Sequence, residues 1–234
     1  MLTFYTNRYK KLFDNYFLPS YNRYLLNEID LIPIYIDQDD SNIKILSDQW
    51  REITQKKISY FYNYLITDKD SELVMLSDCD IVFLDKIKDQ ILLEMGNCDI
   101  TFQADLNDVN SGFFICKNTY EIREMFKKVL ENVKAELSDQ DIINMILRKN
   151  ELKIRFNVLS NLFYNLCKDS KIIKKGRLVN KLFSIDDRYK FIFGGRVAKY
   201  PTTKILMFHA NYLTSLEDKE EVLENILTIY NQNI

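Results

Sequence analysis

The chain has 234 residues, of which 47% are hydrophobic, and this is enough apolar material to bury a substantial core. Thirty-two basic and thirty-four acidic residues give a formal net charge of −2, and the two signs are interspersed, which excludes the basic footprint of a nucleic-acid-binding protein. No window approaches the ~20 apolar residues that span a bilayer, and the first residues lack a signal-peptide pattern, so we expect a cytoplasmic protein with no membrane span. The four cysteines are far apart in the sequence, and we expect free thiols.

The first third of the chain alternates short apolar runs with helical patterns. Leu2–Tyr5 and Leu31–Ile36 are predicted strands, each bounded by polar residues. Apolar residues recur at helical spacing from Tyr9 to Phe17 and from Ile53 to Ile66. The resulting order is strand, helix, strand, helix.

A third predicted strand, Leu73–Leu76, ends in two acidic residues. Its nearly continuous apolar run is typical of a central parallel strand that is buried on both faces. Asp78 and Asp80 follow it, and because side chains two positions apart in an extended segment share a face, the two carboxylates can bind one cation while Cys79 points into the core. By itself, the pattern also fits two acids that only cap or turn the chain after the strand.

Two further strands, Asp99–Phe102 and Gly112–Cys116, flank the polar segment QADLNDVNS. The glycine directly before the second of these strands lets the backbone approach a ligand closely, although Asn110-Ser111-Gly112 also fits an ordinary turn. A helix is predicted from Thr119 to Leu137.

The next predicted helix runs from Ser138 to Leu147. Ser138 is a favourable N-cap, which places Asp139, Gln140 and Asp141 in the first turn. These side chains face whatever lies at the helix start, while helix capping alone accounts for one or two of the acids.

The C-terminal part contains predicted strands at Lys153–Val158 and Lys204–Phe208 and a helix from Leu216. His209, the only histidine of the chain, directly follows the second of these strands. If this strand and the third strand are parallel neighbours, His209 ends at the same edge as the two acids. Two carboxylates and one imidazole suit Mn²⁺, with diphosphate oxygens completing its coordination, but a purely structural histidine is the alternative.

The alternation of strands and helices predicts an α/β fold with a mixed, mostly parallel sheet flanked by helices in a single domain. We expect this domain to cover residues 1–215, with 216–234 forming a C-terminal helix packed on it.

The order of five segments resembles glycosyltransferase family 8 and its relatives: Asp78-Cys79-Asp80, NSGFFICK, SDQDIINMIL, FNVLSNLFYN and MFHANY. The resemblance implies a GT-A (Rossmann-like) fold and a nucleotide-sugar donor, usually a UDP-sugar. It further implies Mn²⁺ or Mg²⁺ as cofactor and transfer with retention to a hydroxyl of a glycan, protein or small-molecule acceptor. In the family a Gly-rich, HxxGxxK-like tail commonly follows the histidine, and here the segment reads HANYLTSLEDK.

The resemblance also implies the roles of individual residues. The metal ligands are Asp78, Asp80 and His209, and the residues at the reacting face are Asp139 and Gln140. For the donor, the resemblance places Thr6 and Asn7 at the nucleoside, Lys57 at the diphosphate, and Asp105, Asn110 and Ser111 at the sugar.

Two other functions fit parts of the sequence. A haloacid-dehalogenase-like Mg²⁺ phosphatase would use Asp78 as its nucleophile, with Asp186 and Asp187 as later metal ligands. The chain is also compatible with a non-catalytic module that binds nucleotide-sugars, because a fold by itself does not secure activity.

Overall fold

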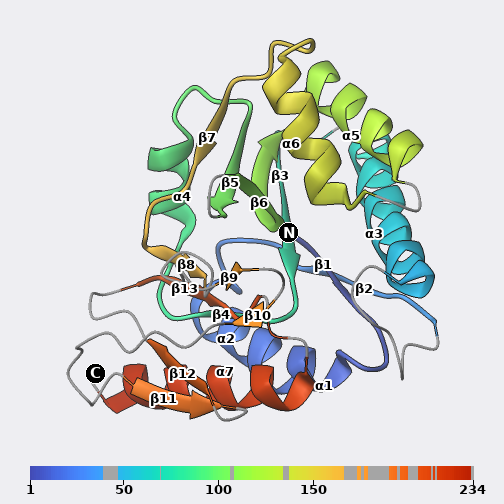
Figure 1. Ribbon diagram of the computed structural model, residues 1–234. Coiled ribbons are helices and arrows are strands. Elements are labelled where there is room, and N and C mark those ends of the chain that lie inside the picture. The colour runs from blue at the N-terminus through green and yellow to red at the C-terminus, as the bar shows by residue number, and fades with distance from the viewer. Residues whose placement is uncertain are drawn as a thin grey trace.

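The computed structural model describes residues 1–38, 47–68, 70–105, 108–133, 137–165, 173–174, 177–178, 190–193, 196–199, 205–211, 213 and 215–232. Six strands form its main sheet in the order β2-β1-β3-β6-β5-β7 (Figure 1). Their bounds are Leu2–Tyr5 for β1, Ile32–Tyr35 for β2, Leu73–Asp78 for β3, Ile100–Ala104 for β5, Val109–Lys117 for β6 and Phe156–Val158 for β7.

Five strands of this sheet run in the same direction. Strand β1 is parallel to β2 and β3, and β5 is parallel to β7, whereas β6 is antiparallel to both of its neighbours, β3 and β5. This arrangement confirms the predicted mixed, mostly parallel sheet. Because β3 is central, its residues Val74 and Leu76 are buried, as the continuous apolar run predicted.

Three helices cover one face of the sheet: α3 (Asp48–Thr67), α5 (Tyr120–Asn132) and α6 (Asp139–Lys149) (Figure 1). Phe61 of α3 lies between Phe114 of β6 and Phe126 of α5, with ring centroids 5.2 and 4.7 Å apart. Burying each such ring contributes about 1.5–3 kcal/mol. Helix α5 ends at Asn132 instead of continuing to Leu137 as predicted.

The other face is covered by the N-terminal helical stretch and by α4 (Lys88–Met95). The stretch consists of α1 (Lys10–Leu12), a single π-helical segment (Phe13–Phe17) and α2 (Leu18–Tyr24). It extends past Phe17, the predicted end of the helix, and includes Pro19 in the first turn of α2.

A second sheet has the order β4-β13-β8, formed by Ile81–Phe83, Met207–His209 and Phe163–Asn165. Helix α7 (Leu216–Gln232) packs on this sheet through Val222, Leu223 and Ile226. Two hairpins, Ile173–Lys174 with Arg177–Leu178 (β9, β10) and Lys190–Phe193 with Arg196–Lys199 (β11, β12), complete the described strands.

Among the described residues, no helix combines the length and the apolar character that crossing a membrane requires.

Candidate active site

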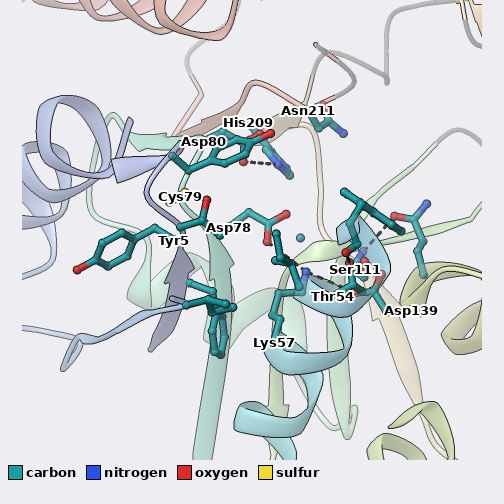
Figure 2. Close-up of a pocket in the computed structure, with 18 of the residues that line it drawn as sticks. Tyr5, Thr54, Lys57, Asp78, Cys79, Asp80, Ser111, Asp139, His209 and Asn211 are labelled. Carbon is teal, nitrogen blue, oxygen red and sulfur yellow. Dashed lines mark hydrogen bonds and ion pairs between the residues drawn. The ribbon is translucent and has the colours of Figure 1, made fainter. Parts of the chain in front are cut away.

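A cavity of about 700 Å³ lies where the carboxyl ends of β1 and β3 meet the first turn of α6 and the second sheet (Figure 2). Nine of the eleven residues singled out in the sequence line it: Thr6, Lys57, Asp78, Asp80, Asn110, Ser111, Asp139, Gln140 and His209. Asn7 is exposed and lies outside the lining, and Asp105 is buried behind Gln140. The fold therefore gathers most of the sequence candidates in one place.

Asp78, Asp80 and His209 converge on one point of the cavity wall. One ligand atom from each residue lies within 4.8 Å of the corresponding atoms of the other two, and Asp80 and His209 are almost fully buried. Cys79 packs in the apolar core, as the strand alternation predicted, and also contributes to the cavity lining. Two carboxylates and an imidazole at this spacing fit a divalent cation such as Mn²⁺ or Mg²⁺.

The route by which His209 reaches the acids differs from the expected one. Strand β13 does not lie beside β3 as a parallel neighbour; it pairs antiparallel with β4, so that His209 is opposite Ile81, directly after Asp80. An antiparallel strand ends where its partner begins, and β4 begins at the acidic motif. The histidine and the acids therefore still meet.

Gly112 of β6 makes room for this cluster. A Cβ atom at this position would lie 2.5 Å from Oδ2 of Asp78 and 2.7 Å from Cε1 of His209. Real Cβ atoms essentially never approach other atoms that closely, so only glycine lets β6 pass beside the two side chains. The Asn-Ser-Gly segment is part of strand β6 and not a turn, and its glycine is required by two side chains, while close approach to a ligand stays a prediction.

Lys57 of α3 reaches the cavity between two carboxylates. Its Nζ lies 3.3 Å from Oδ1 of Asp78 and 3.4 Å from Oδ2 of Asp139 (Figure 2). Apart from this ion pair, the Oδ2 atom of Asp139 has no hydrogen bond among the described residues. Burial alone would lower the pKa of Lys57, but the two carboxylates outweigh it and raise this pKa above its ordinary value. Burial raises the pKa of Asp78, and Lys57 opposes that shift. Lys57 thus links α3 to both the acidic motif and α6.

Lys219 of α7 is a site residue that was not predicted from the sequence. It is 5% exposed, and its Nζ contacts the Asp80 carboxylate and lies 2.9 Å from the carbonyl oxygen of Ala210. Although burial acts in the opposite direction, the Lys219 ammonium holds the pKa of Asp80 well below its usual range. The sequence did contain a signal for it. Lys219 lies three, four and seven positions before Val222, Leu223 and Ile226, which are buried, and this spacing puts it on the apolar face of the helix.

The start of α6 separates two roles within Asp139-Gln140-Asp141. Ser138 and Asp141 form a capping box, because the Ser138 hydroxyl accepts the Asp141 N–H and the Asp141 carboxylate accepts the Ser138 N–H. Gln140 instead donates to Oδ2 of Asp105 at 2.7 Å and accepts the N–H of Ser111 at 3.3 Å. Capping accounts for Asp141, while Asp139 and Gln140 face the cavity.

Asn211 is a buried amide in the wall of the cavity. It is 8% exposed and lines the cavity, and neither its Oδ1 nor its Nδ2 has a hydrogen bond among the described residues (Figure 2). A buried polar group left unpaired costs about 1–3 kcal/mol. Such a group in a cavity wall is a natural contact for a polar ligand.

The sequence matches the model of the family described as nucleotide-diphospho-sugar transferase over residues 31–223, which is most of the chain. The chain therefore belongs to this family, whose members transfer a sugar from a nucleotide-sugar donor. A comparison with curated proteins gives no match.

Two solved structures, with TM-scores of 0.54 and 0.50, support the fold. A glycosyltransferase involved in glycosylation of the major capsid of PBCV-1 is 12% identical, with 95% of this chain and 98% of that one covered and a TM-score of 0.54. The galactosyltransferase LgtC, solved with donor and acceptor sugar analogues, is 8% identical over 99% of this chain and 95% of LgtC, with a TM-score of 0.50. The glycosyltransferase GlyE of Streptococcus pneumoniae is 16% identical over 70% of this chain, with a TM-score of 0.46, and the match spans only 46% of GlyE.

Proposed function

We propose that this chain transfers a sugar from a UDP-sugar to an acceptor hydroxyl, with Mn²⁺ as cofactor and with retention of the anomeric configuration. The observation that carries the proposal is the convergence of Asp78, Asp80 and His209 within a cavity of a nucleotide-diphospho-sugar transferase. The bound metal would supply positive charge to the leaving diphosphate. Asp78, Asp80 and His209 would hold it.

The remaining residues of the cavity fit the parts of such a donor. Tyr5, Ile36 and Trp50 line the cavity and offer apolar surface for a nucleobase. The amide of Asn211, which has no hydrogen bond to the described part of the chain, is available to a polar group of the substrates.

At the reacting centre, Asp139 and Gln140 would stabilise and position an oxocarbenium-like sugar. Gln140 is held by Asp105 and by the backbone of Ser111, so its amide is oriented before the donor arrives. We assign no covalent nucleophile to the reaction.

The proposal is tested by incubating the protein with a panel of UDP- and GDP-sugars in Mn²⁺, Mg²⁺ or EDTA. We expect release of UDP, in Mn²⁺ and not in EDTA, and NMR of the transferred sugar should show the anomeric configuration of the donor. Turnover that is unchanged by EDTA would contradict the metal assignment, and an inverted product would contradict retention.

The same experiment separates the two alternatives. A phosphatase would release phosphate from an aryl phosphate and leave UDP-sugars intact. The later metal ligands of the phosphatase alternative, Asp186 and Asp187, lie outside the described residues. The family match favours the transferase. A non-catalytic module would bind UDP-sugar in Mn²⁺ without any turnover.

A further inference from the structure

Gln103 of β5 is fully buried and contacts His209 across the junction of the two sheets. Its Oε1 lies 2.7 Å from Nδ1 of His209, and its Nε2 lies 3.1 Å from the carbonyl oxygen of Phe163 and 3.2 Å from that of Tyr164. Three hydrogen bonds therefore join one amide of the main sheet to two strands of the second sheet, β8 and β13.

These contacts determine which way the amide of Gln103 points. A backbone carbonyl oxygen only accepts hydrogen bonds, so the group that faces Phe163 and Tyr164 must be the NH₂ of the amide. The reverse orientation would place Oε1 against two other oxygens. The acceptor Oε1 is consequently the atom that faces His209.

The orientation of Gln103 in turn determines the tautomer of His209. Because Oε1 only accepts, Nδ1 of His209 must carry a proton, and in the neutral ring Nε2 then carries the lone pair. Nε2 lies 3.2 Å from Oδ1 of Asp80. In this tautomer of the neutral ring, two acceptors face each other at the point where Asp78 also arrives, and a cation between them relieves this unfavourable contact.

We propose that Gln103 is a positioning residue for the metal site: it holds His209 in the Nδ1–H tautomer and presents Nε2 as a ligand atom. This inference rests on the proposed function, because it takes His209 to be a metal ligand. Without an acceptor at Nδ1, the ring would favour a proton on Nε2, which would donate to Asp80. That proton would occupy the place of the cation.

The first test is the tautomer itself, which needs no metal. His209 is the only histidine, so long-range ¹H–¹⁵N NMR spectra of ¹⁵N-histidine-labelled protein report on this ring alone. At mildly alkaline pH we expect Nδ1 to carry the proton in the wild type. A wild-type ring with its proton on Nε2 overturns the proposal, whether or not the protein binds Mn²⁺.

The second test compares Gln103→Met with Gln103→Glu by titration with Mn²⁺, followed by EPR of the free ion. Gln103→Met removes the acceptor, and we expect it to weaken Mn²⁺ binding about 10- to 100-fold, as loss of a partner of a metal-bound histidine usually does. Gln103→Glu keeps an acceptor for Nδ1, so its Mn²⁺ affinity should stay within about threefold of the wild type. This loss of affinity is smaller than the one expected for Gln103→Met.

The melting temperatures of the two variants provide the control. If Gln103 were purely structural, Gln103→Glu would bind Mn²⁺ no better than Gln103→Met. Gln103→Glu loses the donor to Phe163 and Tyr164, and we expect its melting temperature to fall at least as far as that of Gln103→Met. Mn²⁺ affinities that follow the melting temperatures overturn the proposal. If wild-type protein binds no Mn²⁺ yet shows the expected tautomer, the proposed function fails while the arrangement of Gln103 and His209 stands.

Discussion

At Asp80, one carboxylate meets both the Lys219 ammonium and the imidazole of His209. Asp80→Asn therefore has two effects. We expect turnover to fall at least about 100-fold, because a metal ligand is lost. We also expect the free energy of unfolding to fall by about 3 kcal/mol, because Lys219 keeps a buried charge without its counter-ion. Steady-state kinetics and urea denaturation measure the two effects.

A double variant separates activity from stability at Asp80. Adding Lys219→Met to Asp80→Asn removes the unpaired charge, so most of the lost stability should return while turnover stays low. An Asp80→Asn protein with near wild-type turnover in Mn²⁺ would remove Asp80 from the metal site.

Gly112 offers a residue-scale test of the geometry of the cluster. In Gly112→Ala the new methyl group requires Asp78 and His209 to move apart, so we expect Mn²⁺ affinity to fall about 10- to 100-fold. Isothermal titration measures the affinity. Gly96 is the matched control: its φ of 50° and ψ of −123° are strained for any residue with a side chain, so Gly96→Ala should cost about 1–3 kcal/mol of stability and leave Mn²⁺ affinity unchanged. Equal affinities for both variants would contradict the crowding argument.

At the scale of elements, the first turn of α6 makes a prediction of its own. Gln140→Ala removes the contacts to Asp105 and Ser111, so kcat should fall about 10- to 100-fold, with a smaller loss of UDP affinity, because the reacting centre loses its orientation. The melting temperature should change little, since Gln140 is not the helix cap.

Asp141→Ala is the complementary change in the same turn. It breaks the capping box with Ser138, so we expect a loss of about 1 kcal/mol in unfolding free energy and a kcat close to that of the wild type. If Gln140→Ala lowered only the melting temperature, the residue would be structural.

At the scale of the whole molecule, the proposed metal ligands join the two sheets. Asp78 ends β3 of the main sheet, whereas His209 ends β13 of the second sheet. A cation bound by both stabilises only the folded arrangement, and at a Mn²⁺ concentration 100-fold above Kd it should add about 2.7 kcal/mol. For a chain of this size the melting temperature should rise by roughly 5–10 °C, as measured by calorimetry.

His209→Ala is the variant that tests this link. The increment that Mn²⁺ gives should largely disappear, and UDP binding in Mn²⁺ should weaken with it, because the diphosphate completes the same coordination. The comparison uses the increments, since removing a buried side chain lowers the starting melting temperature as well. An undiminished increment would leave the metal to Asp78 and Asp80 alone.

The sequence by itself determined the local features of this protein. The periods of apolar residues predicted β1, α3 and β3, the Ser138 cap predicted the start of α6, and the two-residue alternation separated Cys79 from the acids on either side. Each of these features depends on residues within a few positions of one another. Helix capping and strand alternation follow from short-range backbone geometry, so they are readable without the fold.

Only the tertiary structure decided which distant residues complete the site. His209 arrives by antiparallel pairing with β4, Lys219 by the packing of α7, and Gln103 by a contact 106 positions along the chain. Strand partners and helix docking depend on which apolar surfaces remain to be covered once the local elements have formed. A local pattern can place Lys219 on the apolar face of a helix, but it does not say which residue Lys219 meets, and so only the fold showed that Lys219 and Gln103 surround the acidic motif and its histidine.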